Sequence, residues 1–171
     1  LGDVYKRQVQ IGYFAQNQAS LMDENLTVFQ TIDDVAKGDI RNKIRDLLGA
    51  FMFGGPEESM KKVKVLSGGE RTRLAMIKLL LEPVNLLILD EPTRGIDVGA
   101  KYEIYCIINQ LVAEGKSVIM ISSELPEILG MCDRIYVMNE GKIVGELAGS
   151  EATQELIMSK ILSAGKKGAL A

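Results

Sequence analysis

Apolar positions along the chain follow two periods, and each period predicts one kind of element. Short apolar or alternating runs predict β-strands at residues 9–15, 86–90, 117–121, 134–138 and 142–146. Apolar residues that recur every three or four positions predict helices at about residues 27–36, 39–53, 71–81, 97–114 and 150–162. Strands that alternate with helices are typical of an α/β fold with a largely parallel sheet.

Several local features refine this prediction. The run 117–121 is apolar without interruption, which fits a strand of a parallel sheet covered on both faces. The segments on either side of Asn139-Glu140-Gly141 alternate, which indicates an edge hairpin. Glu57–Lys64 is charged and is expected to be exposed, and Ala164–Ala171 is expected to be a frayed tail.

The segment Leu66-Ser67-Gly68-Gly69-Glu70 has the pattern of a helix start. Ser67 and Glu70 have the spacing of a capping box, and the two glycines let another group approach the backbone closely. The start of a helix carries unpaired N–H groups and a positive partial charge, which suit a phosphate. A helix cap without any ligand is the simpler interpretation of this motif alone.

The apolar run Leu86–Leu89 leads directly into two carboxylates, Asp90 and Glu91, and Pro92 ends the strand. Open α/β sheets bind ligands at the carboxyl ends of their strands. One carboxylate there could hold Mg²⁺ through water, and the other could accept a proton from an attacking water. A solvated strand end is the simpler alternative for this motif on its own.

The two motifs together, joined by one helix, resemble those of the ATP-binding cassette (ABC) ATPases. Leu66–Glu70 is similar to their signature motif, Leu86–Glu91 to their Walker B strand, and Gly95-Ile96-Asp97 to their D-loop. The resemblance implies a P-loop NTPase-like sheet with flanking helices and a small helical subdomain. It also implies ATP and Mg²⁺ as cofactors.

The resemblance also implies roles for individual residues. Glu91 would be the general base, and Asp90 and Gln16 would contact Mg²⁺, with Gln16 as the Q-loop glutamine. The remaining residues would contact nucleotide, with the signature residues facing ATP that a second cassette holds: Ser67, Gly68, Gly69, Glu70, Asp97 and Ser123. Ser123 occupies the position at which most ABC ATPases carry a switch histidine, so we expect weak or absent hydrolysis from this site.

The phosphate-binding P-loop of these ATPases is not found in the sequence. Gly115-Lys116-Ser117 offers the last three residues of a P-loop, but Gln110 stands where its first glycine is required, and a helix precedes it. We reject it. The chain begins at Leu1, and we expect the P-loop and the first strands to lie upstream, so this chain alone should bind ATP feebly and be inactive.

The chain is expected to form a single partial ABC ATPase domain over residues 1–171. Its expected parts are the Q-loop strand and loop (9–24), the helical subdomain (25–65), the signature, Walker B and C-terminal core (66–149), and the terminal helix and tail (150–171). The resemblance implies a dimer with a second cassette and, in a transporter, transmembrane permease subunits at the inner face of the cell membrane.

The likeness changes along the chain. Residues 9–91, with L-S-G-G-E-R-T-R-L-A, resemble the second cassette of ABC-F proteins, which act at the ribosome. Residues 93–162, with I-S-S-E-L-P-E, resemble the second cassette of a sugar importer. A sugar-import ATPase is favoured, an ABC-F translation factor is the alternative, and a non-functional chimera joined within L-D-E-P-T is a third interpretation.

Composition narrows the choice further. The net charge of −3 offers no electrostatic footprint for nucleic acid, and the absence of histidine excludes imidazole metal ligands. No apolar run approaches the roughly 18 residues of a membrane span. The two cysteines, Cys106 and Cys132, lack C-x-x-C spacing and have apolar neighbours, which predicts burial and a reduced, cytoplasmic location.

Overall fold

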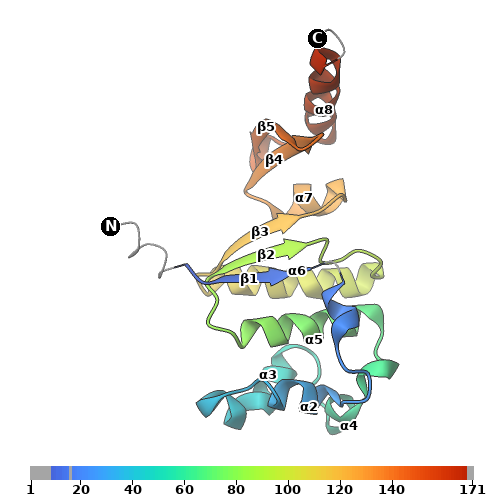
Figure 1. Ribbon diagram of the computed structural model, residues 1–171, viewed down its shortest axis with the longest axis vertical. Helices are drawn as coiled ribbons and strands as arrows, with labels where there is room; N and C mark the ends of the chain where they lie inside the picture. Colours follow the sequence, from blue (N-terminus) through green and yellow to red (C-terminus); the bar gives the residue numbers. More distant parts are fainter. Residues whose placement is uncertain (1–8, 16, 169–171) are drawn as a thin grey trace. The chain divides into compact units, whose positions relative to one another are not determined.

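A computed structural model of the chain describes residues 9–15 and 17–168 (Figure 1). The chain divides after Ile121 into two compact units, residues 1–121 and 122–171. The first unit contains a parallel sheet and most of the helices, and the second contains a β-hairpin with its own small core. Each unit is described by itself below.

Three parallel strands form the sheet of the first unit in the order β1-β2-β3. They are β1 (Ile11–Phe14), β2 (Leu86–Asp90) and β3 (Ser117–Ile121). The register aligns Tyr13 with Ile88 and Ile88 with Ile119, so these three residues share one face of the sheet. The predicted α/β architecture with a parallel sheet is therefore confirmed.

Two long helices, α5 (Gly68–Leu80) and α6 (Val98–Ala113), cover one face of this sheet (Figure 1). The strand residues on that face, Phe14, Leu87 and Leu89, are at most 2% exposed. The opposite face is open among the described residues: Tyr13 is 51% and Ile119 is 50% exposed. The prediction of a strand 117–121 covered on both faces is therefore wrong for the described part of the chain.

Short helical segments link β1 to α5 and form the predicted helical region. They are η1 (Gln18–Leu21), α2 (Val28–Asp33), η2 (Gly38–Lys43), α3 (Ile44–Ala50), α4 (Pro56–Met60) and η3 (Val63–Val65). Their core consists of apolar residues that are at most 1% exposed: Val28, Ile32, Ile44, Leu48, Phe53 and Val63.

Two sequence expectations need correction in this region. The predicted helix from residue 39 starts as the 3₁₀ segment η2, and regular α-helix begins only at Ile44. The stretch Glu57–Lys64 is not uniformly exposed, because Pro56 starts α4 and Val63 is fully buried. Proline suits the first turn of a helix, where its missing N–H is not needed. The prediction for Glu57–Lys64 relied on its charged residues alone, and it therefore missed both α4 and the buried Val63.

The second unit packs a helix on a two-stranded antiparallel sheet. It comprises α7 (Leu125–Met131), β4 (Arg134–Asn139), β5 (Lys142–Ala148), η4 (Gly149–Glu151) and α8 (Gln154–Gly168). Ile135, Val137 and Ile157 form its core. Glu140 and Gly141 both have positive φ angles, as a two-residue hairpin turn requires, so the predicted hairpin is confirmed.

Three further expectations fail outside the sheet. The last helix starts at Gln154 rather than 150, because η4 precedes it, and it continues to Gly168 where a frayed tail was predicted from Ala164. Cys106, predicted to be buried, is exposed. It lies on α6 two positions before Ile108, on the side of the helix that faces away from the core.

The one-sided sheet predicts a large difference between two truncations. Leu87→Ala, at a side chain 1% exposed, should lower the free energy of unfolding by about 2–5 kcal/mol through the cavity it leaves. Ile119→Ala, on the open face of the neighbouring strand, should cost about 1 kcal/mol or less. Urea denaturation measures both. Equal losses would mean that the open face is covered in solution.

Candidate functional site

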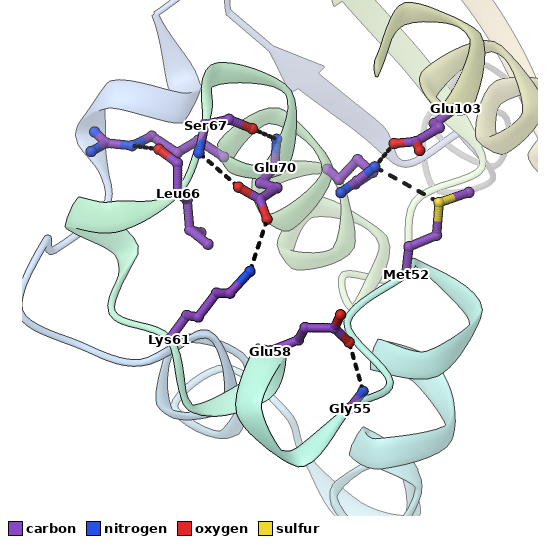
Figure 2. A network of polar contacts seen from close by, with 10 residues as sticks. Met52, Gly55, Glu58, Lys61, Leu66, Ser67, Glu70 and Glu103 are labelled. Carbon is purple, nitrogen blue, oxygen red and sulfur yellow. Dashed lines mark hydrogen bonds and ion pairs between the residues drawn. The ribbon is translucent and has the colours of Figure 1, made fainter. Parts of the chain in front are cut away.

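The signature turn, Leu66–Glu70, is closed by reciprocal hydrogen bonds at the start of α5 (Figure 2). The Ser67 backbone N–H donates to Glu70 Oε2 at 2.7 Å, and the Glu70 N–H donates to Ser67 Oγ at 3.3 Å. The capping box predicted from the sequence is thus present. Ser67 and Gly68 are exposed, and the first-turn N–H groups of Gly68 and Gly69 have no carbonyl of their own helix to bind.

Glu70 is held in its charged form. Partial burial works to raise its pKa, but the hydrogen bonds from the Ser67 N–H and hydroxyl, together with the charge of Lys61, outweigh burial. The pKa of Glu70 therefore lies below its ordinary value. Lys61 Nζ lies 3.5 Å from Glu70 Oε1 (Figure 2), so a cation also stands beside the signature turn.

The two glycines of the turn have different surroundings. A Cβ built on Gly68 would meet nothing within 4 Å. A Cβ built on Gly69 would lie 2.5 Å from Ala100 Cβ and 3.4 Å from Ile96 Cγ2. The group that approaches Gly69 closely is thus the start of α6 in the same chain, which leaves Gly68 as the glycine with open space beside it.

Arg73 joins α5 to α6 one turn further along α5, and no pattern in the sequence indicated this role. Its guanidinium is ion-paired with Glu103 of α6 and lies over the Phe53 ring, 5.4 Å from the centroid, and the residue is only 7% exposed. Burial lowers its pKa from the ordinary value, although the carboxylates of Glu70 and Asp97 act in the opposite direction. Arginine at a helical position normally indicates a solvated face.

The Walker B carboxylates lie where β2 ends. Asp90 faces the open side of the sheet, and its Oδ2 accepts a hydrogen bond from the Tyr13 hydroxyl at 2.9 Å. This bond raises the pKa of Tyr13. The sequence did not single out Tyr13, because the register that brings β1 and β2 together is not visible before the fold is known.

Glu91 has a backbone conformation that L-residues rarely adopt, with φ at +48°. Its N–H donates to the Ile121 carbonyl at 2.8 Å, which ties the residue to the end of β3. A residue in this region costs of order 1–3 kcal/mol and is retained where the surroundings impose it, often at functional sites. The strain supports the expectation that Glu91 has a functional role.

The carboxylate of Asp90 fits a magnesium ion that is shared with phosphate oxygens. Magnesium is commonly bound by one or two carboxylates together with substrate phosphates and water. One oxygen of Asp90 engages Tyr13, and a carboxylate has further acceptor capacity for water or metal. Among the described residues, no group of three acidic, cysteine or histidine side chains could hold a metal by itself.

Asp97 caps α6: its Oδ1 accepts a hydrogen bond from the Ala100 N–H at 3.0 Å. This cap is a local structural role, and the D-loop role of Asp97 stays a prediction. Because Ala100 also lies against Gly69, the structure brings the signature turn and this cap together.

Lys116, from the rejected P-loop, has a structural role. Its Nζ donates a hydrogen bond to the Val84 carbonyl at 2.9 Å.

Two predicted site residues do not belong to the first unit as the structure describes it. Gln16 lies outside the residues that the structure describes. Ser123 belongs to the second unit and is exposed. Its neighbour Ser122 donates through Oγ to the buried carboxylate of Glu127 and accepts a hydrogen bond from the Glu124 N–H at 3.0 Å. The turn at Ser122–Glu124 is therefore held by a residue of α7, Glu127.

The helix starts and strand ends of the first unit meet at one edge of the sheet. The end of α5 lies at the start of the strands, since a Cβ on Gly12 would lie 3.1 Å from Leu79 Cδ1, and Figure 1 shows α5 running back beneath them. Its start, with the signature turn, therefore lies towards the edge where Asp90 and Glu91 end β2. A helix N-terminus and carboxylates near the carboxyl edge of a parallel sheet are features that α/β proteins use to bind nucleotides.

Comparison with known proteins specifies the family. The family described as "ABC transporter" matches residues 3–94, more than half of the chain, and the chain belongs to it. A solved ATP-binding cassette of an ABC transporter in its ADP conformation superposes with a TM-score of 0.72 over 94% of this chain and 69% of its own, at 19% identity. That likeness supports the fold.

Curated relatives are sugar-import proteins. An L-arabinose transport ATP-binding protein of Geobacillus stearothermophilus is 63% identical over 98 residues, 57% of this chain and 19% of its own length. A ribose import ATP-binding protein of Caldanaerobacter subterraneus is 43% identical over 153 residues, 81% of this chain and 31% of its own length. The chain thus spans less than a third of these relatives.

The extent of the ribose-import match bears on the expected change of resemblance along the chain. A match over 81% of the chain cannot be confined to residues 93–162, so it extends into the part that resembles ABC-F proteins. These relatives give no support to the alternative of a ribosome-associated factor.

Among the described residues, no helix is both long and apolar enough to cross a membrane.

The contact at Gly69 predicts opposite effects of the same substitution at adjacent positions. Gly69→Ala should lower the free energy of unfolding by about 1–3 kcal/mol, because Ala100 must move. Gly68→Ala, in open space, should leave stability unchanged or raise it by up to about 1 kcal/mol. Chemical denaturation of the two variants measures this. Similar losses for both would contradict the assigned packing.

The lowered pKa of Glu70 predicts a contribution to stability that depends on pH. The contribution is complete above the pH at which the unfolded carboxyl group titrates, and it is lost as pH falls through the lower folded pKa. Glu70→Gln should therefore lose about 1 kcal/mol at neutral pH and show a shallower decline in acid. Unfolding measured from pH 7 to pH 3 tests this, with the exposed Glu82→Gln as control.

Proposed function

We propose that the chain is part of an ATP-binding and ATP-hydrolysing subunit of a sugar-import ABC transporter. The observation that carries this proposal is the joint packing of the signature turn and the Asp97 cap, at the sheet edge where Asp90 and Glu91 end β2. The sugar-import relatives supply the substrate class. ATP is the nucleotide, and Mg²⁺ accompanies it.

In this proposal the strand-end residues act on the terminal phosphate of ATP. Glu91 accepts a proton from the attacking water, and its restrained backbone fixes where the carboxylate begins. Asp90 would hold Mg²⁺ through water, and Gln16 would contact the metal and the attacking water. Bound Mg²⁺ would neutralise charge that develops on the phosphate oxygens.

The signature turn would act on a second nucleotide. The exposed Ser67 hydroxyl and the Gly68 and Gly69 N–H groups would contact the γ-phosphate of ATP held by a second cassette. Glu70 keeps the turn in shape through the capping box, and Asp97 would lie near the boundary with the second cassette. In this proposal the partners are a second cassette and permease subunits, and the protein would lie at the cytoplasmic face of the membrane.

Ser123 would stand at the γ-phosphate where a histidine is usual. A serine hydroxyl can form a hydrogen bond but cannot carry positive charge, so turnover at this site would be slow. A joint between ABC-F-like and sugar-import-like segments within L-D-E-P-T stays a prediction, and sequencing of the upstream gene tests it.

The assigned general base predicts a selective loss of hydrolysis. In the full gene product that carries this chain, with the ATP site of the second cassette inactivated, Glu91→Gln should lower the slow remaining kcat for ATP by about 10²–10⁴-fold while ATP binding persists. Steady-state phosphate release and equilibrium binding of ATP measure the two quantities. Glu114→Gln, at the exposed end of α6, is the matched control and should change neither. Undiminished turnover in Glu91→Gln would refute the proposal.

A further inference from the structure

Arg71, the residue after the signature turn, reaches back over the chain that leads into it. Its Nε donates to the Leu66 carbonyl at 3.3 Å, and its Nη2 donates to the Lys64 carbonyl at 3.0 Å. Its Nη1 donates to Glu24 Oε1 at 3.0 Å. One guanidinium therefore connects the first turn of α5 with three points on the preceding chain, and its side chain is 23% exposed.

The segment that Arg71 holds is itself anchored to the start of the helical region. The Val28 N–H donates to the Lys61 carbonyl at 3.0 Å, and the Val63 N–H donates to the Leu26 carbonyl at 2.9 Å. Thr27 and Lys62 form an isolated antiparallel bridge between the same two stretches. The Lys64 N–H also donates to the Glu24 carbonyl at 3.2 Å, so only Val65 and Leu66 remain between this anchor and Ser67. Arg71 binds the carbonyls of Lys64 and Leu66, which lie at the two ends of this stretch.

We propose that Arg71 is the positioning residue of the signature turn. By binding the carbonyls of Lys64 and Leu66, it sets where Ser67 and Gly68 lie at the end of α5 and restricts their motion before any phosphate arrives. The inference rests on the proposed function, because it assigns a purpose to a turn that would contact phosphate. Glu70 holds the other side of the same turn through the Ser67 N–H.

The carbonyl bonds should matter more than the ion pair. Glu24 is 58% exposed, and a solvent-exposed ion pair contributes little to stability. The Nε bond to Leu66 is partly buried, and two carbonyls bound by one planar group fix both direction and distance. Lysine carries one point charge in place of this fork, so it should restore the arrangement only in part.

Hydrogen–deuterium exchange of the 171-residue chain tests the positioning directly. In Arg71→Met, the amides of Lys64–Glu70 should exchange about tenfold faster, because two hydrogen bonds that hold the segment are lost. Arg71→Lys should give an intermediate rate, and Glu24→Gln should leave the rate nearly unchanged. Arg41→Met is the matched control, since it removes a bidentate ion pair to Asp33, a residue of α2.

A second measurement separates positioning from a merely structural role. In the full gene product, Arg71→Met should raise the apparent KM for ATP several-fold, because a mobile turn closes less readily over the phosphate. Loss of folded protein would instead lower kcat and leave KM unchanged. Arg71→Lys should recover part of the KM, and Arg41→Met should resemble the unaltered protein.

The outcomes are distinguishable. Exchange in Arg71→Met that matches Arg41→Met would overturn the inference, and so would faster exchange with an unchanged KM, which would make Arg71 structural only. Faster exchange with a raised KM, partly recovered by lysine, is the expected result. If Ser67→Ala and Glu91→Gln leave ATP turnover intact, the proposed function fails by itself, and the exchange data still report on the turn.

Discussion

The close approach of Gly69 to Ala100 leaves no room for a side chain between the starts of α5 and α6. That contact sets the spacing of the two helices on the covered face of the sheet, and the ion pair between buried Arg73 and partly exposed Glu103 joins them further along. Two helix caps, Ser67 and Asp97, consequently lie side by side. The geometry of the site thus depends on a packing constraint that involves no functional group.

Much of the fold follows from local signals in the sequence. Capping boxes at Thr27 and Ser67 and the positive-φ hairpin turn all act over a few residues, so they can be recognised without a structure. What could not be recognised depends on neighbours distant in the chain. An apolar strand such as β3 looks the same whether one or both of its faces are covered.

Some residues of the candidate site could be predicted from local sequence motifs, and others could not. Ser67, Asp90 and Glu91 belong to contiguous motifs whose spacing is visible in the sequence, and the structure puts them at helix starts and strand ends as expected. Tyr13 and Arg73 contact residues far away in the chain, at Asp90 and Glu103, and these contacts exist only after the register and helix packing are fixed. Neither residue type announces such a partner, because tyrosine and arginine are most often surface residues.

The left-handed backbone conformation of Glu91 is unfavourable for stability, whereas its carboxylate is the group expected to have a function. Side chains with a Cβ meet a steric penalty at that φ angle, which is smaller for asparagine and aspartate and larger for β-branched residues, and glycine relieves it fully. A Glu91→Gly substitution would thus relieve the backbone strain and remove the carboxylate at the same time. Retention of an acidic residue in this conformation represents a compromise in which the protein gives up thermodynamic robustness for a charge at the end of the strand.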